Sequence, residues 1–196
     1  MFISLEGIDG SGKSTQARLL VEALGEGTVA IREPGGTEAA ERIRELLADP
    51  GVELAPLAEL MLFLAARADL TERVIRPALE GGRYVVADRF SDSSVAYQGA
   101  ARGLGVGEVI GLCDTATDGL WPDLTLLLKL EPETGLGRAD GDDRFEQEGL
   151  GLQQQVAAAY EEIAMIASDR VVVIDASGSV EEVHGRIMEV VDEHAA

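Results

Sequence analysis

The fold can be predicted from one glycine-rich stretch, Gly7-Ile8-Asp9-Gly10-Ser11-Gly12-Lys13-Ser14-Thr15, which fits the pattern G-x-x-x-x-G-K-[ST]. An apolar run of strand length, Phe2–Glu6, comes directly before it, and a helical pattern over Lys13–Leu24 follows. This order brings successive backbone N–H groups and the positive end of a helix dipole toward one anion. The stretch therefore predicts a phosphate-binding loop (P-loop) that binds a nucleotide. Lys13 would reach its β- and γ-phosphates, and the Ser14 hydroxyl would ligate Mg²⁺.

The rest of the chain alternates between strand and helix patterns. Apolar runs of strand length recur at residues 28–32, 83–88, 124–130 and 170–175. Helical patterns cover residues 37–47, 56–80, 153–167 and 180–191. Uninterrupted apolar strands are typical of a parallel sheet that helices cover on both faces. We therefore predict an α/β fold: a three-layer, doubly wound, five-stranded parallel sheet with right-handed crossovers.

Length and local composition indicate how the chain is organised. With 196 residues, 46% of them hydrophobic, the chain is expected to form a single domain over residues 1–196 with a sizeable core. Residues 135–151 differ from the rest, because they are rich in Gly, Asp and Glu and poor in apolar residues. We expect this segment to be a short mobile lid.

The charge and the cysteine count limit the possible partners. Asp and Glu number 36 against 16 Lys and Arg, which gives a net charge of −20. Such a field opposes general nucleic-acid binding, so a phosphate ligand must be held by a local group of donors. The single cysteine, Cys113, cannot form an internal disulfide. The sequence shows no secretion signal and no apolar stretch of membrane-spanning length, so we expect no membrane partner and a cytoplasmic location.

A second candidate site element lies at the end of the run 83–88. Asp88 ends this run, so its carboxylate should emerge at the carboxyl edge of the sheet, where ligands bind in open α/β folds. It is a candidate metal ligand. Arg89 follows directly and offers a planar guanidinium for a phosphate. The alternative is that the two residues form a surface ion pair at a strand end.

Further motifs follow the P-loop in a fixed order. They are Arg32-Glu33-Pro34-Gly35-Gly36-Thr37, Phe63-Leu64-Ala65-Ala66-Arg67, Asp88-Arg89-Phe90, Ser93-Ser94-Val95-Ala96-Tyr97-Gln98-Gly99 and Asp143-Arg144-Phe145-Glu146. Over about residues 1–175 this series resembles the bacterial thymidylate kinases. The P-loop occurs in many enzymes, whereas the combination of the later motifs is far more specific. The resemblance implies that the γ-phosphoryl group of ATP is transferred to dTMP, giving dTDP, with Mg²⁺ and in a homodimer.

The resemblance also assigns the residues around the acceptor phosphate. A phosphate monoester carries about two negative charges at neutral pH, and its repulsion from ATP grows in a water-poor cleft. Arg32 and Arg89 are the candidate cations between the two anions. Asp9 resembles the family carboxylate near the sugar 3′-hydroxyl and the phosphates, although a loop aspartate can simply cap a turn.

Four other residues are expected to face the nucleoside. Phe63 would stack on a pyrimidine ring and Arg67, one helical turn later, would hydrogen-bond the base edge. Ser94 and Gln98 share the same spacing and would also face the base. Tyr97 resembles the family tyrosine beside the deoxyribose, where its ring would exclude a 2′-hydroxyl. Without the resemblance, Phe63 and Tyr97 would be read as packing residues.

An arginine for the transferred phosphoryl group is expected from the lid, because the P-loop has Ser11 and no arginine. Arg144 is the first candidate, since it lies in the matching Asp-Arg-Phe-Glu stretch, and Arg138 is the second. Either could instead be a solvated charge.

Three other functions stay open on the sequence alone. Another nucleoside monophosphate kinase would use the Phe63/Arg67 and Ser94/Gln98 pairs for a different base, or lack them. A deoxynucleoside kinase has less need of Arg32 and Arg89. A catalytically silent nucleotide-binding module is disfavoured by the intact Lys13.

Overall fold

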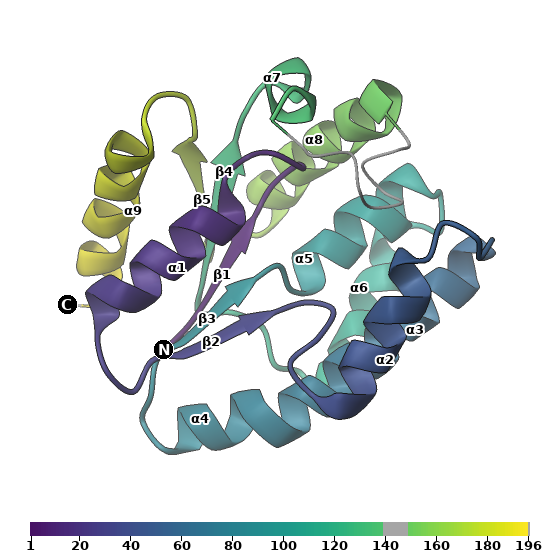
Figure 1. Ribbon diagram of the computed structural model, residues 1–196, viewed down its shortest axis with the longest axis horizontal. Helices are drawn as coiled ribbons and strands as arrows, with labels where there is room; N and C mark the ends of the chain where they lie inside the picture. Colours follow the sequence, from purple (N-terminus) through teal and green to yellow (C-terminus); the bar gives the residue numbers. More distant parts are fainter. Residues whose placement is uncertain (139–148, 196) are drawn as a thin grey trace.

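The computed structural model describes residues 1–138 and 149–195 (Figure 1). At its centre is a sheet of strands β1 (Phe2–Glu6), β2 (Val29–Arg32), β3 (Val85–Asp88), β4 (Leu124–Lys129) and β5 (Val171–Asp175). The strands lie in the order β2-β3-β1-β4-β5, and every pairing is parallel. The predicted fold class is therefore confirmed, and each expected strand is present with slightly shorter or equal bounds.

Helices cover both faces of the sheet. On one face, Ile3 and Leu5 of β1 pack with α1 (Lys13–Leu24) and α9 (Val180–Ala195), which lie side by side in Figure 1. Phe2 points to the opposite face and packs in a separate apolar cluster. Alternate residues of a strand point to opposite faces, and here both faces are buried. This explains why the strands read as continuous apolar runs.

The remaining helices are α2 (Glu38–Ala48), α3 (Pro56–Leu70), α4 (Arg76–Glu80), α5 (Ser91–Ser94), α6 (Val106–Thr117), α7 (Pro132–Leu136) and α8 (Gly149–Ile166). Two π-helical segments, η1 (Thr71–Ile75) and η2 (Val95–Ala101), continue α3 and α5. The predicted helix 56–80 thus corresponds to α3, η1 and α4 together. The sequence reading did not predict α6, and it placed the start of α8 too late.

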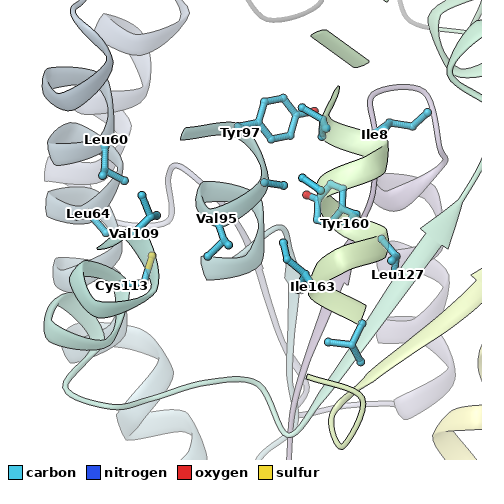
Figure 2. Close-up of a cluster of buried hydrophobic side chains, with 14 residues drawn as sticks. Ile8, Leu60, Leu64, Val95, Tyr97, Val109, Cys113, Leu127, Tyr160 and Ile163 are labelled. Atoms are coloured by element: carbon cyan, nitrogen blue, oxygen red, sulfur yellow. The ribbon is translucent and has the colours of Figure 1, made fainter. Parts of the chain in front are cut away.

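An apolar cluster between α3, α6, η2 and α8 supports the carboxyl edge of the sheet (Figure 2). Leu64 of α3 meets Val109 and Cys113 of α6, and all three side chains are buried. Figure 2 shows Tyr97 of η2 and Tyr160 of α8 at the same cluster. Dense apolar packing holds helices in fixed positions. The cluster therefore fixes η2 and α8, both of which carry polar side chains toward the P-loop.

The segment expected to form a lid is only partly described. Its first residue, Gly135, lies in α7, and its last residues lie at the start of α8. Residues 139–148, which include Arg144, lie outside the described residues, so a mobile lid stays a prediction. Within the described part of the chain, no helix is both long and apolar enough to span a membrane.

Candidate functional site

The P-loop and Asp88 lie next to each other because β1 and β3 are neighbours. Leu5 of β1 is in register with Asp88 of β3, so both strands end at the same edge of the sheet. A cavity of about 750 Å³ opens at this edge. This volume is in the range of small-molecule binding sites. The topology thus brings the two motifs found in the sequence to one cavity.

Two glycines give the P-loop its shape. Gly10 has φ +71°, and a Cβ atom there would lie 2.0 Å from the Gly135 carbonyl oxygen. Gly12 has φ +94° and directly precedes α1, and a Cβ atom there would meet no atom within 4 Å. Gly12 is thus required for its backbone conformation, and the space before it is open. The N-terminus of α1 therefore faces a free volume where an anion can bind.

Lys13 lies over this loop with its side chain almost fully buried. Its Nζ donates to the Ile8 carbonyl oxygen at 2.6 Å and to Ser11 Oγ at 3.3 Å. Burial lowers the pKa of Lys13 to about 8, and the nearby Arg89 guanidinium lowers it too. The carboxylates of Asp9, Asp88 and Glu6 offset this lowering only in part, and phosphate oxygens would add further negative charge beside the ammonium group.

Ser14 and Asp88 form the candidate metal site. Ser14 Oγ donates to Asp88 Oδ2 at 2.5 Å, and both residues line the cavity. Mg²⁺ prefers oxygen ligands and usually binds one or two protein groups together with water and phosphate. No group of three or more His, Cys, Asp and Glu residues among those described could hold a metal by itself. The hydroxyl and carboxylate pair therefore fits Mg²⁺ that arrives with a nucleotide.

Arg89 joins the P-loop to η2. Its Nη1 donates to the Gly7 carbonyl oxygen and to Ser93 Oγ, both at 3.2 Å. Its Nη2 pairs with Asp9 Oδ1 and reaches the Tyr97 hydroxyl at 3.4 Å. Burial by itself would raise the pKa of Asp9, but the charges of Arg89 and Lys13 and the hydrogen bonds from Gln153 and Tyr97 together outweigh burial, and the pKa is lowered. Asp9 and Arg89 are therefore a charged pair that lines the cavity.

A buried carboxylate that the sequence reading missed holds the turn around Arg89. Glu6 is fully buried, and it accepts the Phe90 N–H at 2.7 Å, Ser93 Oγ at 2.6 Å and the Tyr160 hydroxyl at 2.8 Å. Burial raises the pKa of Glu6 to about 7. Arg89 has φ +72°, an uncommon conformation for a residue with a side chain. Glu6 holds Phe90 and Ser93, which follow this residue, and so stabilises that conformation.

The other end of the cavity carries the residues expected to face a base. Phe63 of α3, Ser94 of α5, and Tyr97 and Gln98 of η2 all line it. Ser94 Oγ and Gln98 Oε1 are buried, and neither atom has a hydrogen-bond partner in the structure. Buried polar atoms are nearly always paired, so two unpaired atoms at a cavity indicate a polar ligand.

Arg67 also lines this cavity, but most of its donors are already engaged. It is 1% exposed, pairs with Glu33 at 2.7 Å and donates from Nη2 to the Phe90 carbonyl oxygen at 3.2 Å. Its Nη1 faces Cys113 Sγ at 3.5 Å. A hydrogen bond from Arg67 to a base edge therefore stays a prediction.

The structure brings most of the predicted site residues to one cavity. Its lining includes Asp9, Gly10, Ser11, Gly12, Lys13, Ser14, Thr15, Arg32, Phe63, Arg67, Asp88, Arg89, Ser94, Tyr97, Gln98 and Arg138. Gly7 and Ile8 are not part of that lining and contribute carbonyl oxygens to Arg89 and Lys13 instead. Arg144 lies outside the described residues.

The sequence reading did not nominate two polar residues of the site. Gln153 of α8 is fully buried and contacts Asp9 through both ends of its amide group. Arg44 of α2 lines the cavity and donates to the Pro34 carbonyl oxygen at 2.9 Å. Neither residue belongs to a motif. Only the tertiary structure identifies them, since Gln153 and Asp9 are 144 positions apart in the sequence.

Comparisons with known proteins agree with this geometry. Residues 5–187 match the family model described as thymidylate kinase. A thymidylate kinase of Synechococcus sp. (strain JA-3-3Ab) is 48% identical over 194 residues, which cover 97% of this chain and 95% of the relative. One of Thermosipho africanus is 44% identical over 199 residues, covering 99% and 98%.

Solved structures give the same result. The crystal structure of a thymidylate kinase from Ehrlichia chaffeensis superposes with a TM-score of 0.83 at 33% sequence identity, covering 98% of each chain. The family model and the relatives span nearly the whole chain, P-loop and carboxyl-edge cavity included. The chain belongs to the thymidylate kinase family.

Proposed function

We propose that this protein transfers the γ-phosphoryl group of ATP to dTMP and releases dTDP and ADP. The observation that carries the proposal is that one cavity is lined by the P-loop, by Arg89 and by Phe63, Ser94 and Gln98. The phosphate-binding loop and the residues expected to contact the base therefore line the same cavity. Family membership supports the same activity.

The P-loop side would bind ATP. Its backbone N–H groups and the N-terminus of α1 would face the β-phosphate, and Lys13 would reach the oxygens of the β- and γ-phosphates. Ser14 and Asp88 would hold Mg²⁺, which neutralises phosphate charge when it is bound. Phosphoryl transfer requires mainly alignment and charge neutralisation, which rigid donors supply without reorganisation.

The opposite side would bind dTMP. Arg89 lines the cavity between the P-loop and η2, so it is placed to hold the acceptor phosphate against its repulsion from ATP. Arg32 is exposed at the same cavity and is the second candidate cation. Asp9 would contact the sugar 3′-hydroxyl, and Tyr97 would lie beside the deoxyribose.

Base recognition would use Phe63 for stacking, with Ser94, Gln98 and Arg67 at the base edge. The unpaired atoms of Ser94 and Gln98 support this assignment. From the lid side, Arg144 would serve the transferred phosphoryl group, with Arg138 as the second candidate. Arg138 is exposed and lines the cavity.

The test is an ADP-release assay with ATP, Mg²⁺ and each of dTMP, dUMP, dCMP, dAMP and dGMP. We expect dTMP to give the highest kcat/KM. Equal rates with all bases would contradict the thymine assignment and favour a less selective nucleoside monophosphate kinase. Absence of turnover with every acceptor would favour a silent nucleotide-binding module.

We further propose that the protein is a homodimer and acts in the cytoplasm, where ATP is supplied. Leu57 and Met61, one turn apart on α3, are 52% and 44% exposed, which supports an apolar contact with a second copy. Light scattering on the wild type and Met61→Lys tests the assembly. We expect Met61→Lys to lose the dimer. Met165→Lys makes the same change at another exposed methionine and should keep the dimer.

A further inference from the structure

A buried acidic residue near the base end of the cavity has no part in the function proposed so far. Glu59 of α3 is 1% exposed, and its Oε1 accepts a hydrogen bond from Gln98 Nε2 at 2.8 Å. On another side, Arg102 Nε lies 3.3 Å from the same oxygen. Gln98 lines the cavity, whereas Glu59 does not. Glu59 therefore reaches the cavity lining through Gln98.

This contact fixes which end of the Gln98 amide group remains for a ligand. A carboxylate oxygen accepts hydrogen bonds and cannot donate them, so the amide group must turn its NH₂ toward Glu59. The amide oxygen, Oε1, is buried and has no partner. A buried acceptor without a donor is destabilising, so this atom is suited to a ligand that donates a hydrogen bond.

We propose that Glu59 is a positioning residue that holds the Gln98 amide oxygen toward the nucleobase and so selects pyrimidines with a hydrogen on N3. The inference rests on the proposed function and adds to it a rule for the base. Thymine and uracil donate from N3. Cytosine presents an unprotonated N3, which is an acceptor and would repel Gln98 Oε1.

Glu59 also prevents the Gln98 amide group from turning over to accept cytosine. To donate to cytosine, the Gln98 amide would have to turn over, which would place Oε1 against the Glu59 carboxylate. Two acceptors would then face each other in a buried site, where such repulsion is costly. Arg102 balances the Glu59 charge and lies outside the lining of this cavity.

The experiment compares dUMP and dCMP, which both lack the 5-methyl group and differ in the group on C4, a carbonyl in uracil and an amino group in cytosine, and so in whether N3 carries a hydrogen. We would measure kcat/KM for both acceptors in the wild type and in Glu59→Gln. A glutamine at this position can offer either an oxygen or an NH₂ group, so the Gln98 amide is no longer fixed. We expect the dUMP to dCMP ratio to fall by about tenfold or more, mainly through a gain with dCMP.

The matched control is Glu72→Gln, which removes the same charge from an exposed position of η1. It should leave the ratio at the wild-type value. A general structural defect would lower kcat/KM for dUMP and dCMP together and leave their ratio unchanged. A wild-type ratio in a folded Glu59→Gln protein, as judged by Tm, therefore overturns the inference.

Two further outcomes are decisive. If Glu59→Gln does not fold, Glu59→Asp replaces it, because the shorter carboxylate loses its reach to Gln98 Nε2: a fall in the ratio supports the role of Glu59, and an unchanged ratio overturns it. If the wild type phosphorylates neither dTMP nor dUMP, the proposed function itself fails. Wild-type activity with dTMP and an unaltered ratio in the variants defeats only the role of Glu59.

Discussion

Gln153 of α8 holds Asp9 of the P-loop at two points. Gln153 Nε2 donates to Asp9 Oδ2 at 2.7 Å, and Gln153 Oε1 accepts the Asp9 backbone N–H at 3.1 Å. The other carboxylate oxygen of Asp9 pairs with Arg89. The start of α8 is thus connected through Asp9 to the guanidinium that is proposed to hold the acceptor phosphate.

The first prediction follows from this connection. Gln153→Leu removes both contacts, so Asp9 keeps its contacts with Arg89 and the Tyr97 hydroxyl but is no longer fixed to α8. We expect kcat/KM for dTMP to fall by about tenfold to a hundredfold, because small displacements of a positioning group are costly in phosphoryl transfer. Gln154→Leu, at an exposed neighbouring position, is the control and should retain wild-type rates. Equal behaviour of the two variants would contradict the role of Gln153.

Arg89→Lys should be strongly impaired although the charge is kept. The guanidinium contacts Gly7, Ser93 and Asp9 from separate N–H groups, and an ammonium group cannot reproduce that geometry. We expect kcat with dTMP to fall by about a hundredfold or more in steady-state assays. Arg83→Lys, at an exposed site, should have no effect. Near-normal kcat in Arg89→Lys would exclude a geometric role for the guanidinium.

The Mg²⁺ requirement of the reaction should depend on the Asp88 carboxylate. EDTA should abolish turnover, and Asp88→Asn should raise the Mg²⁺ concentration needed for half-maximal rate by about tenfold or more, since a carboxylate ligand is lost. The measurement is a Mg²⁺ titration at saturating ATP and dTMP. Asp192→Asn, on the exposed side of α9, is the matched control. A Mg²⁺ requirement that does not change in Asp88→Asn would place the metal elsewhere.

The buried Lys13 predicts an alkaline limit for ATP binding. Its pKa in the free protein is lowered to about 8, and a lysine is charged only below its pKa. We therefore expect kcat/KM for ATP, which reports the free enzyme, to fall as the pH rises through about 8. The corresponding fall in kcat should occur at higher pH, because bound phosphates favour the charged form of Lys13. A kcat/KM profile that stays flat up to the ordinary lysine pKa of about 10.4 would contradict this account.

Alanine substitution separates the two lid candidates. We expect Arg144→Ala to lower kcat by about a hundredfold and Arg138→Ala to have a smaller effect, because one arginine near the transferred phosphoryl group supplies most of the charge stabilisation. Single-turnover kinetics with preformed complexes distinguish the chemical step from binding. Unchanged turnover in Arg144→Ala would remove the assignment, and a large loss in Arg138→Ala alone would transfer the role to Arg138.

The sequence predicted the parts of the structure that depend on local patterns. The P-loop is recognisable because Gly10, Gly12 and Lys13 are close in sequence and their chemistry requires that spacing. The apolar strands were equally clear, because a sheet that is covered on both faces leaves no polar positions in its centre. Because Asp88 ends an apolar run, the sequence also predicted that Asp88 and Arg89 lie at the carboxyl edge of the sheet, where both line the cavity.

Long-range contacts could not be predicted in the same way. Glu6, Glu59 and Gln153 act on site residues through hydrogen bonds between distant segments, and a lone Glu or Gln is no motif. The helix α6 was missed although its buried residues Val109, Cys113 and Thr117 recur every four positions, because Gly107 and Gly111 lower the helix propensity of the segment. Arg67 shows the reverse limit: its position on α3 was predicted correctly, but its buried pairing with Glu33 depends on the folded chain.

The central claim is that ATP and dTMP bind in one cavity, where the γ-phosphoryl group of ATP is transferred to the phosphate of dTMP. Phosphorus NMR of the purified protein with ATP, Mg²⁺ and dTMP measures this directly. We predict that the β-phosphate signal of dTDP grows in step with ADP, that inorganic phosphate does not accumulate, and that Lys13→Ala suppresses both products. Formation of ADP with inorganic phosphate alone, or unaltered dTDP formation in Lys13→Ala, would contradict the account.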